Sequence, residues 1–165
     1  MRAPVLGIVG PGDDATPADL RAAESLGALA ATAGWIVVNG GVASGVMEAA
    51  SRGANGAGGL VIGVLPGSDD RDASPSLSVA LRTGMGQARN NILVLSSDAV
   101  AVCGMSPGTA VEAALAIRAR RAVVCVGATA ETRAFLTGID AGRVVHFVDT
   151  PEEALGVLRS VVSRR

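Results

Sequence analysis

Apolar and polar residues follow two different periods along this chain. Short apolar runs that end in glycine, proline or aspartate are typical of buried strands. Longer segments with apolar residues three and four apart are typical of helices that pack on one face. We predict strands at residues 4–9, 35–38, 60–65, 99–103, 122–126 and 144–148. We predict helices at residues 17–34, 44–52, 87–95, 109–120 and 151–162.

The alternation of strands and helices predicts an α/β fold. Right-handed crossovers between such elements produce a parallel sheet with helices on both faces. Hydrophobic residues make up 49% of the chain but aromatic residues only 2%, so the core must consist of Val, Leu, Ile and Ala, as in a sheet buried on both sides. We therefore expect a single doubly wound domain over residues 1–165, with about six parallel strands.

Composition argues against several function classes. The net charge of −1 and the few aromatic residues disfavour nucleic acid as a partner, including single-stranded DNA. All fourteen basic residues are arginine, which removes the lysine that pyridoxal phosphate or a Walker motif needs. No apolar run is as long as a membrane span and no signal-peptide pattern opens the chain. We expect a cytoplasmic protein without a membrane partner.

Histidine and cysteine offer little chemistry. His146, the only histidine, lies in an apolar run and is predicted to be a strand residue. Cys103 and Cys125 lie at or near the ends of predicted strands and are interpreted as small buried residues, not as a disulfide pair. No cluster of histidine and cysteine suggests a metal site.

Glycine-rich turns follow several predicted strands. In parallel sheets the carboxyl ends of the strands meet at one edge, and ligands bind there where the strand order reverses. Glycine lets a phosphate approach the backbone closely. The residues predicted to bind a phosphate or nucleotide are Gly10, Pro11, Gly12, Gly40, Gly41, Ser44, Gly45, Gly104, Gly108 and Thr109. A Gly-x-Gly-x-x-Gly fingerprint is missing after the first strand, which disfavours an ordinary NAD enzyme.

The segment at residues 104–112 has two interpretations at this point. It joins a predicted strand to a predicted helix, and free N–H groups at a helix N-terminus attract anions. Thr109 would then bind a phosphate, with Glu112 beside the group that carries it. The same Thr109-x-x-Glu112 pattern is also a capping box, which needs no ligand.

Arg89 lies in the predicted helix at residues 87–95, which precedes the strand that leads into this segment. A guanidinium group there would hold a phosphate or orient Glu112. The alternative is a solvated arginine on a helix surface, which is the common fate of charged side chains.

Four motifs in this order resemble the LOG-like proteins, a family that includes cytokinin-activating phosphoribohydrolases, proteins labelled lysine decarboxylases and molybdenum-cofactor carriers. The motifs are residues 39–47, residues 58–66, Arg89-Asn90, and Gly108-Thr-x-x-Glu112. The resemblance implies a Rossmann-like fold, a homodimer or higher homo-oligomer, phosphate binding by Gly108 and Thr109, and catalytic roles for Arg89 and Glu112.

The chain departs from the hydrolases of this family at two places. They carry Pro-Gly-Gly-x-Gly-Thr, whereas Met105 and Ser106 replace the inner glycines here. They also carry Arg-Lys where this chain has Arg89-Asn90. Both departures favour the branch near the molybdenum-cofactor carriers, and the absence of lysine argues against a pyridoxal-phosphate decarboxylase.

Two functions follow from these residues. The first is hydrolysis of a nucleoside 5′-monophosphate to free base and ribose 5-phosphate, in which Glu112 stabilises positive charge on the ribose or activates water. The sequence has no evident general acid for this reaction, and Asp13 and Asp14, which follow the turn after the first strand, are named only because of that position. The second is a non-catalytic carrier or sensor that holds molybdenum cofactor or a nucleotide. Neither function requires a resident cofactor.

Overall fold

The computed structural model describes residues 2–163, which form a parallel sheet with helices on both faces. The strands are β1 (Val5–Val9), β2 (Ile36–Asn39), β3 (Val61–Leu65), β4 (Val79–Arg82), β5 (Ala99–Cys103), β6 (Ala122–Val126) and β7 (Val145–Val148). The helices are α1 (Pro17–Thr32), α2 (Gly45–Gly56), the 3₁₀ turn η1 (Gly86–Ala88), α3 (Arg89–Ser96), α4 (Pro107–Arg118), α5 (Ala130–Ile139) and α6 (Pro151–Val162). The predicted doubly wound, Rossmann-like architecture is confirmed.

The strand order reverses between β1 and β5. The sheet has the order β4-β3-β2-β1-β5-β6-β7, and all its strands are parallel. The chain moves outward from β1 to β4, returns to the other side of β1 as β5, and then moves outward to β7. The turns that follow β1 and β5 therefore diverge, which is the position where doubly wound sheets bind ligands.

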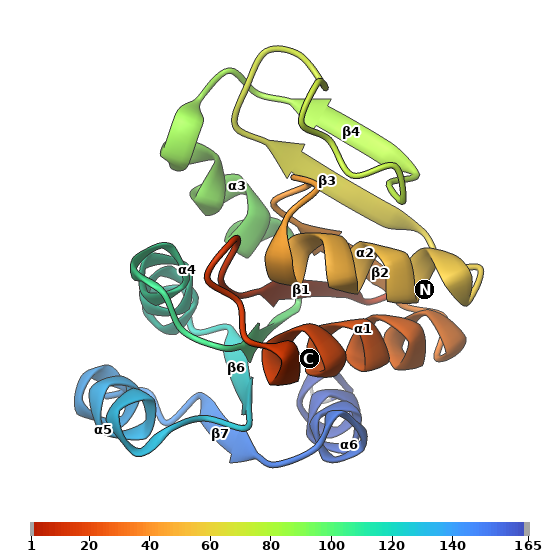
Figure 1. Cartoon of the computed structure of the whole chain (residues 1–165). Helices are drawn as coiled ribbons and strands as arrows, with labels where there is room; N and C mark the ends of the chain where they lie inside the picture. Colours follow the sequence, from red (N-terminus) through yellow and green to blue (C-terminus); the bar gives the residue numbers. More distant parts are fainter. Residues whose placement is uncertain (1, 164–165) are drawn as a thin grey trace.

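Helices α1, α2 and α6 cover one face of the sheet, and α3, α4 and α5 cover the other (Figure 1). Successive strand residues point to opposite faces, so Leu6 and Ile8 of β1 pack with the first group while Val9 packs with the second. Every residue of β5 and β6 is buried, as expected for interior strands of a parallel sheet. This explains why their sequences are continuous apolar runs.

Strand β4 and helix α5 have no counterpart among the predicted elements. The sheet has seven strands in place of the predicted six or so, and the additional strand is β4. It lies at the edge of the sheet, is largely exposed, and follows β3 through a loop instead of a helix. An edge strand needs no apolar run, so its sequence lacks the usual signal. Helix α5 is short and buries only Thr132 and Leu136, and it too has no counterpart among the predicted elements.

Helix α2 extends beyond residue 52, where it was predicted to end. It continues through Gly53 to Gly56. A Cβ atom on Gly53 would overlap the carbonyl of Glu24 in α1, and one on Gly27 in α1 would overlap the carbonyl of Ala50 in α2. These glycines therefore let α1 and α2 pack backbone to backbone, which offsets the cost of about 1 kcal/mol that glycine carries in a helix.

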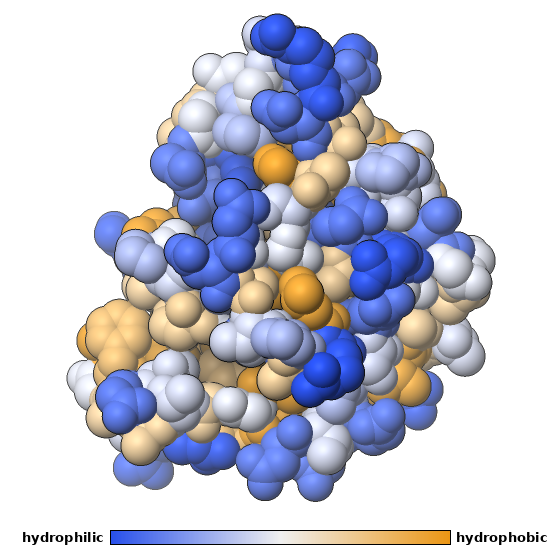
Figure 2. All heavy atoms as spheres, viewed as in Figure 1, coloured by the Kyte–Doolittle hydropathy of each residue, from blue (hydrophilic) through white to orange (hydrophobic). Residues whose placement is uncertain are grey.

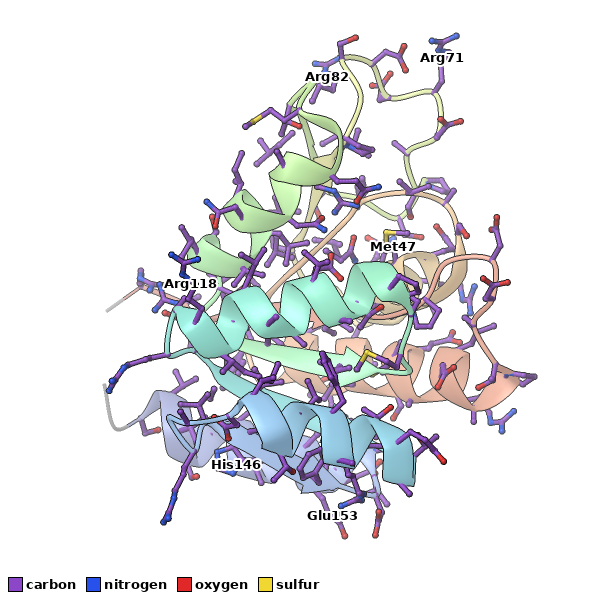
Figure 3. All side chains as sticks on the ribbon, turned by 90° about the vertical axis from the view of Figure 1, so that its left-hand side faces the viewer. Met47, Arg71, Arg82, Arg118, His146 and Glu153 are labelled. Atoms are coloured by element: carbon purple, nitrogen blue, oxygen red, sulfur yellow. The ribbon has the colours of Figure 1, made fainter. Side chains whose placement is uncertain are left out.

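The two cysteines and the histidine lie where they were predicted to lie. Cys103 and Cys125 are free and buried, and burial raises the pKa of both thiols to about 12. His146 lies in β7 (Figure 3). Hydrophilic side chains gather over the β3–β4 connection (Figure 2), where Asp69 pairs with Arg71 and Asp70 with Arg82. None of the helices in residues 2–163 combines the length and apolarity needed to cross a bilayer.

Candidate functional site

A cavity of about 210 Å³ lies where the strand order reverses. The turns after β1 and β2, the start of α3 and the start of α4 all contribute to its wall. Its lining residues are Ile8, Val9, Gly10, Gly12, Gly40, Met47, Gln87, Arg89, Asn90, Ser106, Gly108, Thr109 and Glu112. Segments that are far apart in the sequence thus converge at one place on the carboxyl edge of the sheet.

The structure brings together seven of the predicted site residues in this cavity. They are Gly10, Gly12, Gly40, Gly108, Thr109, Arg89 and Glu112. The other five lie around it. Ser44 and Gly45 line a neighbouring cavity beside α2, Pro11 and Gly104 line another between α1 and α5, and Gly41 is buried in the turn after β2.

Arg89 is buried without an ion-pair partner. Only 7% of the residue is exposed, and its Nε and Nη1 atoms have no hydrogen-bond partner in residues 2–163. Burial lowers the pKa of Arg89, and the nearby Glu112 charge opposes this shift. The alternative of a solvated helical arginine is therefore wrong. A buried cation without a counterion is costly, and an anionic ligand would provide the missing partner.

Glu112 has an unusually high pKa for a carboxylic acid. The residue is 8% exposed, and burial raises its pKa to about 7, although the positive charge of Arg89 lowers it in part. Burial therefore disfavours the ionised form of this carboxyl group. A second anion bound nearby would disfavour ionisation further, because like charges raise the pKa of an acid.

The start of α4 is capped by Ser106, so the Thr109–Glu112 capping box is wrong. Thr109 N donates to Ser106 Oγ at 3.3 Å, and the two side-chain hydroxyls lie 2.9 Å apart. The helix begins at Pro107, two residues before Thr109. Ser106 satisfies the N-terminal donor that a capping box would have used, and Glu112 is left free of that role at the cavity wall.

Asn39 holds the turn after β2 in place. Its fully buried side chain donates from Nδ2 to Ser51 Oγ at 2.9 Å and accepts at Oδ1 from Gly41 N at 2.8 Å. Gly41 has a positive φ of 76°, a conformation that glycine adopts without strain. These contacts fasten the Gly40–Gly41 turn to α2 and so position the wall against which Arg89 packs.

Gly40 provides the space for the Arg89 guanidinium. A Cβ atom at Gly40 would overlap Arg89 Nη1 and would lie 2.5 Å from the Met47 sulfur. Both are the ends of flexible side chains, so they would move instead of the backbone. We expect Gly40→Ala to cost less than about 1 kcal/mol of stability but to weaken the binding of inorganic pyrophosphate about tenfold, because the guanidinium is displaced.

Urea unfolding and calorimetry measure these two effects. The matched control is Gly56→Ala, because no atom lies within 4 Å of a Cβ built there. That variant should keep its pyrophosphate affinity. Equal affinities of Gly40→Ala and wild type would show that the guanidinium position does not matter for anion binding.

Several lining residues were not singled out from the sequence as site residues. They include Met47, Gln87, Asn90 and Ser106. Met47 and Asn90 lie inside the family motifs, and Ser106 lies in the loop that departs from them, which was the available signal. Gln87 reaches the cavity only through the packing of η1. Neither Asp13 nor Asp14 lines the cavity. Asp13 accepts from Ser44 Oγ at 2.6 Å, and Asp14 lines the cavity beside α1 and α5.

Metal ligands are not grouped in this structure. Among residues 2–163, no three His, Cys, Asp or Glu side chains are arranged to hold a metal ion. The chemistry available at the site comes from a guanidinium group, a carboxyl group of high pKa, two hydroxyl groups and the N–H groups at the start of α4. This donor set suits a phosphate group.

Comparisons with known proteins extend the resemblance to almost the whole chain. The structure superposes on a molybdenum cofactor binding protein from Rippkaea orientalis with a TM-score of 0.95 and 40% identity, covering 98% of this chain and 99% of that one. It superposes on a molybdenum cofactor carrier protein from Chlamydomonas reinhardtii with a TM-score of 0.93 and 41% identity, covering 99% and 100%.

Sequence comparison agrees with the structural one. An uncharacterized protein from Archaeoglobus fulgidus is 35% identical over 157 residues, which is 94% of each chain. The model of the SLOG cluster4 family matches residues 3–155. This match spans the sheet, both helical layers and all residues of the Arg89–Glu112 cavity, and the chain belongs to the SLOG cluster4 family.

Proposed function

We propose that this protein is a carrier of molybdenum cofactor, which it holds by the phosphate group without hydrolysing it. The observation that carries the proposal is the buried and unpaired guanidinium of Arg89 in a cavity where the strand order reverses. Similarity to proteins that bind or carry this cofactor, at 40% and 41% identity over nearly the full chain, supports the choice of ligand.

A phosphate group fits the residues of the cavity. Arg89 would donate charge-assisted hydrogen bonds to its oxygens. The N–H groups at the start of α4 would add the partial positive charge of the helix, and Gly108 leaves the approach open, since a Cβ there would meet nothing nearer than 3.9 Å. The hydroxyl groups of Ser106 and Thr109 line the same wall and offer further donors.

Hydrolysis of a nucleoside monophosphate is the second candidate, because Arg89 and Glu112 line one cavity as that mechanism requires. Two observations favour the carrier instead. Stabilising positive charge on a ribose needs an ionised carboxylate, but the pKa of Glu112 is already about 7 and a bound phosphate would raise it further. In addition, Asp13, one of the two residues considered for the general acid, lines neither this cavity nor the adjoining one between α1 and α5.

Cofactor retention by the purified protein tests the carrier. The full chain is produced in a host that makes molybdenum cofactor and is isolated without oxygen. The bound pterin is then oxidised to its fluorescent form, and molybdenum is measured by elemental analysis. We expect both to co-purify with wild type and with Arg118→Met but not with Arg89→Met. Wild-type protein that carries no pterin, and takes up none when mixed with cofactor released from a molybdoenzyme, would overturn the proposal.

Chromatography after incubation with a panel of nucleoside 5′-monophosphates tests the second candidate. We expect no free base at high protein concentration. Release of base that disappears in Glu112→Gln would instead establish a phosphoribohydrolase.

The homodimer implied by the resemblance stays a prediction. Leu95 of α3 and Val111 of α4 are 50% and 53% exposed. They lie on the two helices that we expect to pair across a two-fold axis, and analytical ultracentrifugation measures the association directly.

A further inference from the structure

A second cavity adjoins the Arg89 cavity across the turns that follow β1 and β5. Its volume is about 370 Å³. It lies at the carboxyl ends of β5 and β6, between the start of α1 and the start of α5, which Figure 1 shows on opposite sides of β6. Pro11 lines the second cavity while its neighbours Gly10 and Gly12 line the first, so a single turn separates the two.

The floor of this second cavity is apolar. Val102 and Val126 from the ends of two strands lie there, together with Met105 and Cys125. Burial raises the pKa of the Cys125 thiol to about 12, so the sulfur is protonated at neutral pH and contributes an uncharged surface. Such a floor suits the face of a flat ring.

One carboxylate is held firmly at the edge of this floor. Asp19 Oδ2 accepts from Thr16 N at 2.9 Å as part of the capping box of α1. The same carboxylate lies against the Cα of Gly104, where a Cβ would come within 2.5 to 2.8 Å of its carbon and oxygen atoms. Gly104 also has a positive φ of 82°. A carboxylate accepts at two oxygens with about four lone-pair sites, so acceptor capacity remains for a ligand.

The two cavities differ in charge. The first holds the Arg89 cation together with the Glu112 carboxyl, whose pKa burial raises to about 7. Asp14 and Asp19 place carboxylates at the second. A phosphate group is attracted to the first cavity and repelled by the second. A ligand with a phosphate at one end and N–H donors at the other therefore binds in one orientation.

We propose that the second cavity binds the nitrogen-rich ring of the phosphorylated ligand, with Asp19 accepting hydrogen bonds from two adjacent ring N–H groups. The proposal rests on the proposed function for the position of the phosphate. The 2-amino-4-oxo edge shared by pterins and guanine presents two neighbouring donors, which match the two carboxylate oxygens. The corresponding edge of adenine presents a donor beside an acceptor, so the cavity selects pterin and guanine over adenine.

Binding measurements with three probes test this assignment. Unphosphorylated pterin, GMP and AMP are titrated into the full chain, using pterin fluorescence for the first and calorimetry for the nucleotides. We expect wild type to bind GMP more tightly than AMP. Asp19→Asn keeps an oxygen for Thr16 N and nearly the same volume, yet it should weaken pterin and GMP about tenfold and leave AMP unchanged, since a bidentate charged contact is lost. Asp13→Asn, in the cavity beside α2, is the matched control and should change none of the three.

A second variant covers the case in which Asp19→Asn disturbs α1. Ala128→Phe adds a large side chain to the lining of the second cavity and changes neither residue of the capping box, and it should weaken pterin binding by a similar factor. Unchanged pterin and GMP affinities in both variants would overturn the inference.

The phosphate site is judged separately by Arg89→Met. If Arg89→Met lost affinity for GMP while Asp19→Asn kept its affinities for pterin and GMP, the proposed phosphate site would stand and the ring site would be refuted. If Asp19→Asn weakened pterin binding while Arg89→Met left GMP binding unchanged, the phosphate site alone would be refuted.

Discussion

Arg89→Met is expected to abolish the binding of inorganic pyrophosphate and, in the same protein, to raise the free energy of unfolding. Each hydrogen bond to a charged group contributes about 1.5 to 3 kcal/mol. Loss of two such bonds corresponds to an affinity loss of about 100-fold or more. Calorimetric titration measures the affinity, and urea unfolding without ligand measures the stability.

The gain in stability follows from the unpaired charge. Arg89 is 7% exposed and forms no ion pair with a residue of the described chain. Replacing buried ionic groups by apolar side chains of similar volume is often neutral or stabilising by about 1 to 4 kcal/mol, and methionine suits the space beside Met47 and Gly40. A gain in stability in Arg89→Met would show that the protein gives up stability to keep this cation, as binding sites commonly do.

Arg118→Met is the matched control for this experiment. Arg118 is exposed at the end of α4 that lies away from the cavity and from Met47 (Figure 3). An exposed substitution of this kind changes stability by less than about 0.5 kcal/mol, and it should leave pyrophosphate binding unchanged. If Arg89→Met retained its affinity for pyrophosphate, Arg89 would not bind the anion. If the variant unfolded more easily than wild type, the unpaired arginine would not lower the stability of the protein.

Glu112→Gln is expected to remove a large pH dependence of stability. The pKa of Glu112 is raised from 4.5 to about 7 by burial, so the unfolded chain ionises at lower pH than the folded one. The contribution of this group to stability is complete below pH 4.5, declines as pH rises, and is lost above pH 7. A shift of this size corresponds to roughly 3 kcal/mol. Glutamine cannot ionise and shows no such decline.

Urea unfolding of wild type and Glu112→Gln at pH 5 and pH 8 measures the effect. The stability of the variant relative to wild type should be greater at pH 8 than at pH 5 by roughly 2 to 3 kcal/mol. Glu24→Gln is the control, because the Glu24–Arg52 pair is at the surface and such pairs contribute less than about 1 kcal/mol. A difference that stays constant with pH would mean that Glu112 ionises at its ordinary pKa, and the hydrolytic mechanism would regain its carboxylate.

The central strands could be predicted because burial on both faces leaves a signature in the residues themselves. β5 and β6 are continuous apolar runs, and their bounds agree with the prediction. The edge strand β4 and helix α5 bury few side chains, so their sequences carry no comparable period. The predicted end of α2 at residue 52 is wrong for a related reason, since Gly53 lets α2 approach α1 and does not end the helix.

Some features of the site could also be predicted from the local sequence, whereas others depend on tertiary packing. The alternation of strands and helices predicted that the glycine-rich turns would lie together at the carboxyl edge of the sheet, because the carboxyl ends of parallel strands all lie on one side. The sequence could not show which hydroxyl group caps α4. Ser106 and Thr109 both have suitable side chains, and the choice depends on where the chain leaves β5.

The charged state of the site depends on contacts that no local pattern contains. Arg89 and Glu112 were identified as candidates from motif and position, but an arginine at a helix start is as compatible with solvent as with burial. Gly40 and Met47, brought in by β2 and α2, enclose the guanidinium. The same burial raises the pKa of Glu112. Residue types and the order of elements thus predict where these side chains converge, whereas their desolvation, which arises only when distant segments pack together, is the basis on which we propose an anion site.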